Sequence, residues 1–155
     1  MLHLLASYVP CLMAYSYVLG CAKFGINSSV DLDSPRLSRF LRLAKDHMCI
    51  GNDLASWEKE KRAYDAGKVN RLLNSVAIAK DLFHLSTDEA AMAMVEALQL
   101  QIEVDIDTEI QQMMHEDAMT VEEWRYVDAI LYALSGNIFA STIMARYGGE
   151  ASKLV

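Results

Sequence analysis

Signals for the start of a helix recur along this sequence, and each is followed by apolar residues at helical spacing. Ser34 and Pro35 suit a cap and the first helical position. Ser86–Glu89 and Thr120–Glu123 each match the capping box, in which Ser or Thr is followed three positions later by Glu. We expect the three helices to run to about Tyr64, His115 and Tyr147.

Two further stretches are expected to be helical. Residues 70–83 have apolar residues at helical spacing, and residues 1–22 form an almost uncharged run that we expect to be a fully buried helix, bent or started near Pro10. No stretch shows the alternation of a half-buried strand. The sequence therefore predicts an all-α helical bundle, and 155 residues suffice for a single domain over 1–155 with a buried core.

The uncharged run at residues 1–22 also raises the question of a membrane span. Pro10 in its middle, scattered Ser and Tyr residues and the absence of a basic flank argue against a span. No positive region precedes Leu4, as a signal peptide would require. We prefer the buried helix and keep a small membrane-anchored protein as an alternative.

Composition excludes one class of partner and indicates a compartment. The net charge is −7 and the 14 Lys and Arg residues are dispersed, so no basic patch exists for nucleic acid. Cys11, Cys21 and Cys49 lack a metal-type spacing, and we expect buried free thiols in the cytoplasm, a reducing compartment. The four histidines show no ligand spacing either; His47 and His84 are expected at the surface or satisfied in the core.

A polar stripe lies within the helix expected over residues 35–64. Asn52, Ser56 and Glu60 follow at intervals of four, so each is turned by about 40° from the last, and together they span about 12 Å. Helix side chains lean toward the N-terminus, so Glu60 can reach back toward the other two. An amide oxygen, a hydroxyl and a carboxylate are ligands that suit Mg²⁺. Lys59 lies beside them as a candidate positive charge for a substrate phosphate. The alternative is a solvated face, which we accept for the charged neighbours Glu58, Lys61 and Arg62.

The pattern Asn-Asp-Leu-x-Ser-x-x-Lys-Glu over residues 52–60 resembles the second metal-binding motif of class I terpene synthases, with fungal cyclases the most similar. The resemblance covers most of the chain but only the C-terminal half of the family's catalytic domain. It implies the C-terminal half of the class I terpenoid synthase fold. It also implies that Asn52, Ser56 and Glu60 hold Mg²⁺.

A second match lies near the end of the chain. Arg146 and Tyr147 form a dipeptide that carries no information by itself. Without a resemblance, Arg146 is simply a basic residue favourably placed at a helix C-terminus. In class I terpene synthases a late Arg-Tyr pair looks just like this and contacts the substrate diphosphate, Arg through a bidentate fork and Tyr through its hydroxyl. The resemblance therefore implies that Lys59, Arg146 and Tyr147 bind the diphosphate of a farnesyl, geranylgeranyl or longer prenyl substrate.

Two parts of the family's active site are missing from the sequence. The first is the aspartate-rich metal motif: no Asp-Asp pair exists, and Asp105 and Asp107 lie on the wrong side of the Asn52–Glu60 motif in chain order. The second is the Arg that senses diphosphate, because residues 1–22 contain no Arg. The chain is therefore expected to be a piece of a longer protein or a truncated relative.

These features leave two main hypotheses beside the membrane-anchored one. The first is a Mg²⁺-dependent terpene cyclase, lacking the Asp-rich motif and inactive alone or in need of its missing half. The second is a non-catalytic, cyclase-derived helical protein that binds another chain. Either way, a half-bundle exposes the apolar faces that the missing helices would cover, so we expect self-association or association with an N-terminal half.

Overall fold

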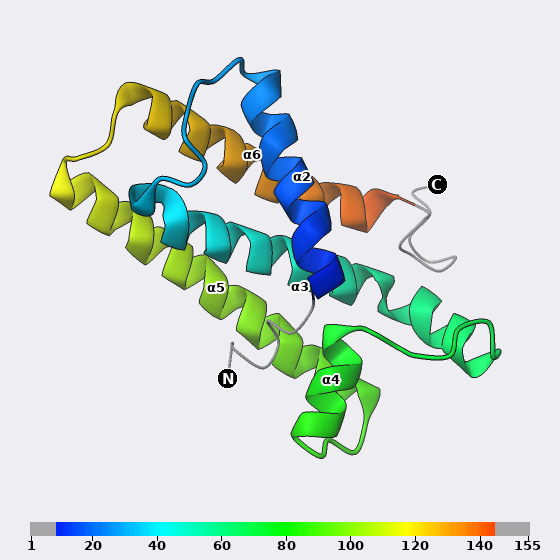
Figure 1. Ribbon diagram of the computed structural model, residues 1–155. Coiled ribbons are helices and arrows are strands. Elements are labelled where there is room, and N and C mark those ends of the chain that lie inside the picture. The colour runs from blue at the N-terminus through cyan, green and yellow to red at the C-terminus, as the bar shows by residue number, and fades with distance from the viewer. Residues whose placement is uncertain (1–8, 145–155) are drawn as a thin grey trace. The chain divides into compact units, whose positions relative to one another are not determined.

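The computed structural model describes residues 9–144, and the structural statements below concern that part of the chain. Its elements are helices, and residues 9–144 contain no strand. The helices, labelled in Figure 1, are α2 (Val9–Gly25), α3 (Pro35–Asp65), α4 (Ser75–Leu82), α5 (Asp88–Glu116) and α6 (Val121–Ile143). The all-α prediction is confirmed.

The described residues divide into two compact units. Unit 1 comprises Ile50–Gln99 and residues 137–144, and unit 2 comprises residues 9–49 and Leu100–Gly136. The helices α3, α5 and α6 each pass from one unit into the other along the chain. Whether residues 1–155 unfold as the single domain expected from their length stays a prediction.

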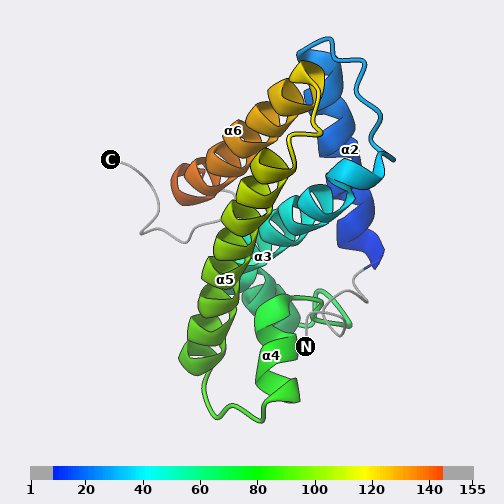
Figure 2. The same ribbon diagram turned by 90° about the vertical axis from the view of Figure 1, so that its left-hand side faces the viewer.

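Unit 2 holds the larger apolar core. It is formed by helix α2, the first half of α3, the second half of α5 and most of α6, whose backbones Figure 2 shows from the side. Among its fully buried side chains are Leu37, Phe40, Ile102, Tyr126 and Ile130. The Tyr126 hydroxyl donates to the Leu19 carbonyl at 2.8 Å, and burial raises the pKa of Tyr126 to about 12.

Helix α6 begins at the predicted capping box. The Thr120 amide donates to Glu123 Oε2 at 2.8 Å, and the Glu123 amide donates to Thr120 Oγ1 at 3.2 Å. The helix start predicted at Ser86 is displaced by one residue. Helix α5 begins at Asp88, so Thr87 is the cap and accepts from the Ala90 amide at 3.1 Å. Glu89 therefore stands one position too early to close a box.

Helix α3 follows the prediction at both ends. Pro35 is its first residue, while the Ser34 hydroxyl, expected as a cap, donates to Glu123 Oε1 at 3.5 Å. At its other end the Lys68 amide donates to the Ala63 carbonyl at 2.9 Å, around Gly67 at φ +66°. This Schellman arrangement needs a left-handed residue, which glycine adopts without steric cost.

Helix α4 is shorter than the stretch 70–83 predicted from periodicity. Asn74 is extended (φ −150°, ψ 140°), and its side chain accepts from the Val76 amide, so the helix cannot begin before Ser75. Residues 70–74 form a connecting segment.

Helix α2 extends from Val9, the first described residue, and contrary to expectation it is not fully buried. It continues through Gly20 to Gly25, beyond the predicted residue 22. Tyr17 is 75% exposed and Phe24 is 88% exposed. The thiol of Cys21 is also exposed and that of Cys49 is half-buried, so the prediction of buried thiols is wrong for both. The hydrophobicity of the sequence alone did not reveal which faces of α2 are buried against other helices. Within residues 9–144 no helix is long and apolar enough to cross a membrane.

Candidate functional site

The polar stripe lies in the later turns of α3, within unit 1, and it is not a solvated face. Ser56 is 1% exposed, and Asn52 and Glu60 are half-buried. By contrast, Glu58 and Arg62 on the same helix are exposed, as expected for charged residues on a solvated face. The continuous helix keeps the three oxygen-bearing side chains on one face.

Glu60 is fixed by a residue from outside its own helix. Its Oε2 accepts from the Asn74 side-chain amide at 3.1 Å. The same amide donates to the Asp53 carbonyl at 2.8 Å, and Asn74 itself has no exposed surface. The second carboxylate oxygen of Glu60 is not used by this contact, so it remains able to bind a cation.

Asp53, the second residue of the motif, has a structural task. Its Oδ2 accepts from the Ser75 amide at 2.8 Å and from the Ser75 hydroxyl at 2.6 Å, which ties the start of α4 to α3. Burial raises the pKa of the Asp53 carboxyl; the bonds from Ser75 lower it in part, and the charge of Glu60 raises it. The carboxylate is thus directed at α4, about 100° around the helix from Asn52.

The remaining predicted residues have different surroundings. Ser56 Oγ donates weakly to the Asp53 carbonyl at 3.5 Å, which leaves its oxygen lone pairs available. Lys59 is exposed. Arg146 and Tyr147 lie outside the described residues, so nothing in the structure tests their proximity to the stripe.

Helices α5 and α6 approach α3 closely just before the stripe. A Cβ placed on Gly51 would lie 3.2 Å from Gln99 Nε2 and 3.3 Å from Ile138 Cδ1. The Asn137 amide nitrogen in the same place is buried without a hydrogen-bond partner among the described residues. Gly51 therefore permits a packing that a larger residue would disturb beside Asn52.

The donor set fits a hard divalent cation that takes few protein ligands. One amide oxygen, one hydroxyl and one carboxylate are all oxygen donors, the kind that Mg²⁺ accepts while keeping water and phosphate ligands. Within residues 9–144 no group of three or more His, Cys, Asp or Glu side chains could hold a metal. A single carboxylate, Glu60, therefore carries the charge of this candidate site.

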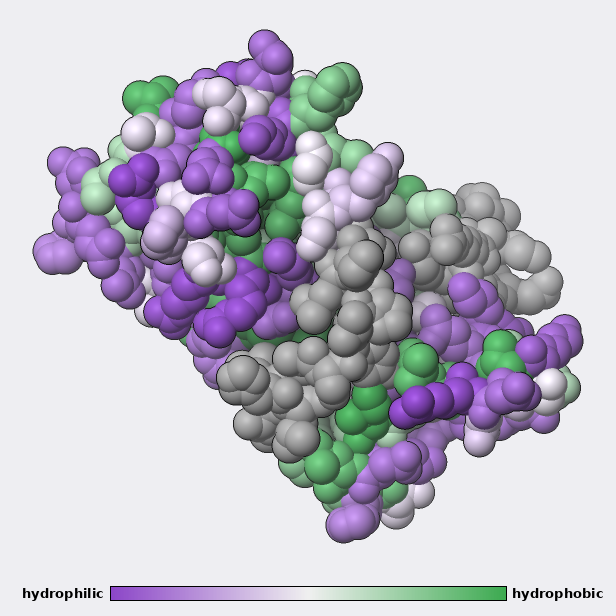
Figure 3. All heavy atoms as spheres, in the orientation of Figure 1, coloured by the Kyte–Doolittle hydropathy of each residue, from purple (hydrophilic) through white to green (hydrophobic). Residues whose placement is uncertain are grey.

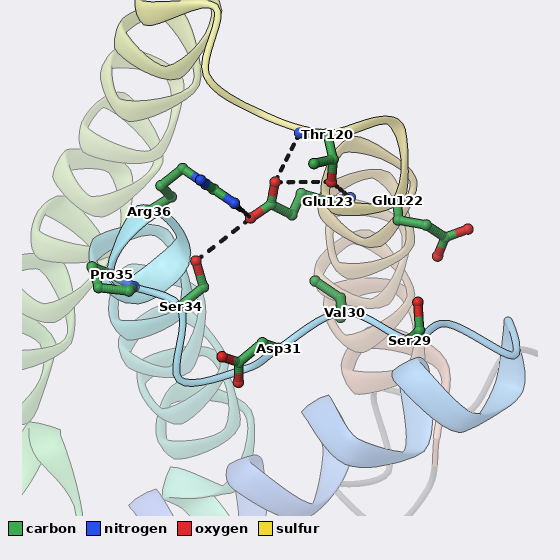
Figure 4. A pocket seen from close by; sticks show the side chains of 9 residues that line it. All are labelled: Ser29, Val30, Asp31, Ser34, Pro35, Arg36, Thr120, Glu122 and Glu123. Atoms are coloured by element: carbon green, nitrogen blue, oxygen red, sulfur yellow. Dashed lines mark hydrogen bonds and ion pairs between the residues drawn. The ribbon is translucent and has the colours of Figure 1, made fainter.

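Two cavities of the described chain lie away from the stripe. One, of about 520 Å³ in unit 2, is lined by polar residues around Arg36 and Glu123 (Figure 4). One of its three carboxylates is already paired at both oxygens: Glu123 Oε1 accepts from Arg36 at 2.8 Å, and Oε2 accepts from the Thr120 hydroxyl at 2.9 Å. Another, of about 500 Å³ in unit 1, lies beside Trp57 and Lys61. Neither is lined by a predicted site residue.

The other polar candidates are structural. His47 is buried with Nε2 3.0 Å from Glu103 Oε1, a core histidine as expected, although its Nδ1 has no partner within the described residues. His84 is at the surface in a left-handed conformation with φ +52°. Asp105 Oδ1 accepts from Gln101 on its own helix at 2.9 Å.

The helical fold and the stripe agree with comparisons to known proteins. A family model described as "Terpene synthase family 2, C-terminal metal binding" matches residues 5–103, which include α3 and the whole stripe. The chain therefore belongs to the terpene synthases, in their C-terminal metal-binding region. The resemblance inferred from residues 52–60 is confirmed.

Three curated fungal relatives support the assignment. A bifunctional sesterterpene synthase of Aspergillus aculeatus is 29% identical over 106 residues, 68% of this chain and 15% of the relative. Fusicoccadiene synthase of Phomopsis amygdali is 24% identical over 153 residues, 96% of this chain and 21% of the relative. The bifunctional type I diterpene synthase tndC of Aspergillus flavipes is 26% identical over 129 residues, 83% of this chain and 17% of the relative. The chain thus spans about a fifth or less of these proteins.

Proposed function

We propose that this chain supplies the Asn/Ser/Glu half of a Mg²⁺-dependent terpene synthase active site. Asn52, Ser56 and Glu60 would hold the metal ion. The observation that carries the proposal is the burial of the stripe: Ser56 is 1% exposed, and Glu60 is held by the Asn74 amide at 3.1 Å. A solvated polar face has neither feature.

The substrate of this proposal is a prenyl diphosphate. Lys59, Arg146 and Tyr147 would bind its diphosphate, the Arg as a bidentate fork. A bound Mg²⁺ supplies positive charge at the leaving group, where charge develops when an allylic diphosphate ionises. The relatives are named as diterpene and sesterterpene synthases, which favours geranylgeranyl diphosphate or a longer substrate over farnesyl diphosphate. The cytoplasm stays the proposed compartment, on the composition of the sequence.

In this proposal the chain supplies only half of the positive charge that holds the substrate diphosphate. The sequence has no Asp-Asp pair to hold further Mg²⁺, so the residues present can bind diphosphate but neutralise only part of its charge. We infer that ionisation and cyclisation require a chain that carries the aspartate-rich half.

A second candidate function, a non-catalytic interaction protein, has its own support. Apolar side chains gather at the surface over α4 (Figure 3). Leu73 is 47% exposed, Leu82 is 41% exposed and Phe83 is 38% exposed. Both functions therefore include association, with a second copy or with the missing half, through apolar surface.

Ligand-dependent stability tests the metal site. Mg²⁺ with inorganic diphosphate at about 100 times its Kd should stabilise the wild-type chain by about 2.7 kcal/mol, which raises Tm by about 5–10 °C for a chain of this size. Glu60→Gln should abolish this increment and leave the apo Tm nearly unchanged. The matched control is Glu58→Gln, an exposed carboxylate on the same helix, which should keep the increment. An equal increment in Glu60→Gln and wild type would contradict the site.

A further inference from the structure

Asn74 lies outside α3, and its side chain donates a hydrogen bond to Glu60 of the proposed metal stripe. It stands immediately before α4, fourteen positions after Glu60. Nothing in the motif over residues 52–60 points to it.

The Asn74 side chain is held at both of its ends. Its Oδ1 accepts from the Val76 amide at 2.9 Å, as the N-cap of α4. Its amide nitrogen donates to the Asp53 carbonyl at 2.8 Å and to Glu60 Oε2 at 3.1 Å. With 0% exposure, the amide has no water to exchange with and little room to turn. It is therefore a rigid donor.

This rigid donor acts on a flexible acceptor. Glu60 has a long side chain and is only half-buried, so its carboxylate could otherwise sample several rotamers. The bond from Asn74 fixes Oε2 and leaves Oε1 for a cation, and a neutral amide leaves the carboxylate its negative charge. Substitution of an outer residue that orients a metal ligand in this way commonly lowers metal affinity by about 10–100-fold.

We propose that Asn74 is a positioning residue for Mg²⁺ binding: it orients Glu60 through its side-chain amide while its carbonyl oxygen caps α4. This inference rests on the proposed function, because it requires Glu60 to be a metal ligand. It adds a residue that the terpene synthase motif does not contain, and it couples the start of α4 to the metal site.

The competing explanation is that Asn74 only anchors α4. Asn74→Ser separates the two tasks, since a serine hydroxyl still caps a helix but cannot donate to Glu60 from that position. Ser75→Ala is the matched control. It removes the neighbouring anchor from the Ser75 hydroxyl to Asp53 Oδ2 (2.6 Å) and leaves the Asn74 bond to Glu60 in place.

The experiment is a calorimetric titration of Mg²⁺ into the 155-residue chain with inorganic diphosphate present, with Tm measured by circular dichroism. Wild type should bind, and Asn74→Ser should weaken Mg²⁺ binding by about 10–100-fold. Ser75→Ala should lower Tm and keep the wild-type Kd. Glu60→Gln should lose binding.

Each other result decides something. If wild type and Glu60→Gln bind Mg²⁺ alike, the proposed function fails and this inference fails with it. If Glu60→Gln loses binding but Asn74→Ser keeps the wild-type Kd, only this inference fails. Equal weakening in Asn74→Ser and Ser75→Ala would assign the effect to the anchoring of α4.

A measurement that needs no Asn74 variant covers the case in which Asn74→Ser does not fold. The side-chain amide protons of Asn74, observed by NMR in wild type, should shift when Mg²⁺ and diphosphate are added, because their acceptor becomes a metal ligand. They should not shift in Glu60→Gln. An unchanged Asn74 signal in wild type at saturating Mg²⁺ would overturn the inference.

Discussion

Asp53 shows how one buried carboxylate can organise the beginning of another helix. It accepts two hydrogen bonds from Ser75, one from the backbone amide and one from the hydroxyl. Both donors are buried and have no water to replace the carboxylate. Asp53, which does not face the polar stripe, therefore sets the position of the segment from which Asn74 reaches Glu60.

Removal of that carboxylate should destabilise the chain strongly. Asp53→Ala leaves two buried donors without a partner, each at a cost of about 1–3 kcal/mol, so we expect a loss of about 2–4 kcal/mol in the free energy of unfolding, measured with urea. The control is Asp65→Ala, whose side chain is 53% exposed and pairs with Lys61, and which should change stability by less than about 0.5 kcal/mol. Similar losses in the two variants would refute the anchoring role.

The sequence predicted the stripe but not what holds it. Asn52, Ser56 and Glu60 are related by helix geometry alone, so their common face follows from spacing. The burial of Ser56 and the contact from Asn74 depend on a connection fourteen residues away, which periodicity does not describe. One signal was available: Asn before an apolar helical run is a frequent N-cap.

At the scale of the element, helix starts were predicted where side chains from another segment reinforce the local rule. Glu123 closes the box with Thr120 and also accepts from Arg36 at 2.8 Å and from Ser34 at 3.5 Å. In residues 9–144 no contact of this kind involves Ser86, and Thr87, the residue next to it, is the cap instead. Short-range rules place a helix start to within a residue or two, and tertiary contacts choose between neighbouring candidates.

The Glu123 carboxyl makes the stability of α6 pH-dependent. Burial alone would raise the pKa of Glu123, yet the hydrogen bonds from Thr120 and Arg36 together lower it below its ordinary value of 4.5. A lowered folded-state pKa means that its contribution is present above pH 4.5 and is lost as pH falls through the folded pKa.

Glu123→Gln should therefore lower Tm at pH 7, and the difference from wild type should shrink as pH falls below about 4. The glutamine keeps the size of the side chain but loses the charge that Arg36 and the Thr120 amide stabilise. Thermal melts of both proteins between pH 3 and pH 7 measure the effect. A Tm difference that stays constant across this range would contradict the assigned role of the charge.

At the scale of the whole molecule, three helices, α3, α5 and α6, each contribute residues to both units. The two Trp residues of the chain fall one in each unit: Trp57 in unit 1, 3% exposed, and Trp124 in unit 2, half-buried. They are therefore separate reporters of the unfolding of each unit. The expectation that residues 1–155 form a single domain can be tested with them.

If the chain is one cooperative domain, the units should unfold together. In Trp57→Phe the fluorescence reports unit 2, and in Trp124→Phe it reports unit 1. Within each variant the urea midpoint from fluorescence should coincide with that from circular dichroism, which follows all helices. Fluorescence and circular dichroism midpoints that separate in either variant would show that the two units unfold independently.

The last prediction concerns activity, where the sequence supplies reasons in both directions. The stripe of Asn52, Ser56 and Glu60 is intact, and family membership is established for residues 5–103. The aspartate-rich motif is absent from the sequence, and loss of a single preorganised group of this electrostatic kind commonly costs a factor of about 10² to 10³ in rate. The loss of a whole motif should cost far more.

We therefore expect diphosphate binding without turnover. The 155-residue chain incubated with Mg²⁺ and farnesyl or geranylgeranyl diphosphate should give no cyclic product above background, measured by gas chromatography with mass detection. Addition of the aspartate-rich half of a relative's cyclase domain as a separate chain should restore product, and Glu60→Gln should abolish it again. Robust cyclisation by the isolated chain would mean that other residues of this sequence complete the diphosphate site, because ionisation needs more positive charge than one Mg²⁺ site supplies.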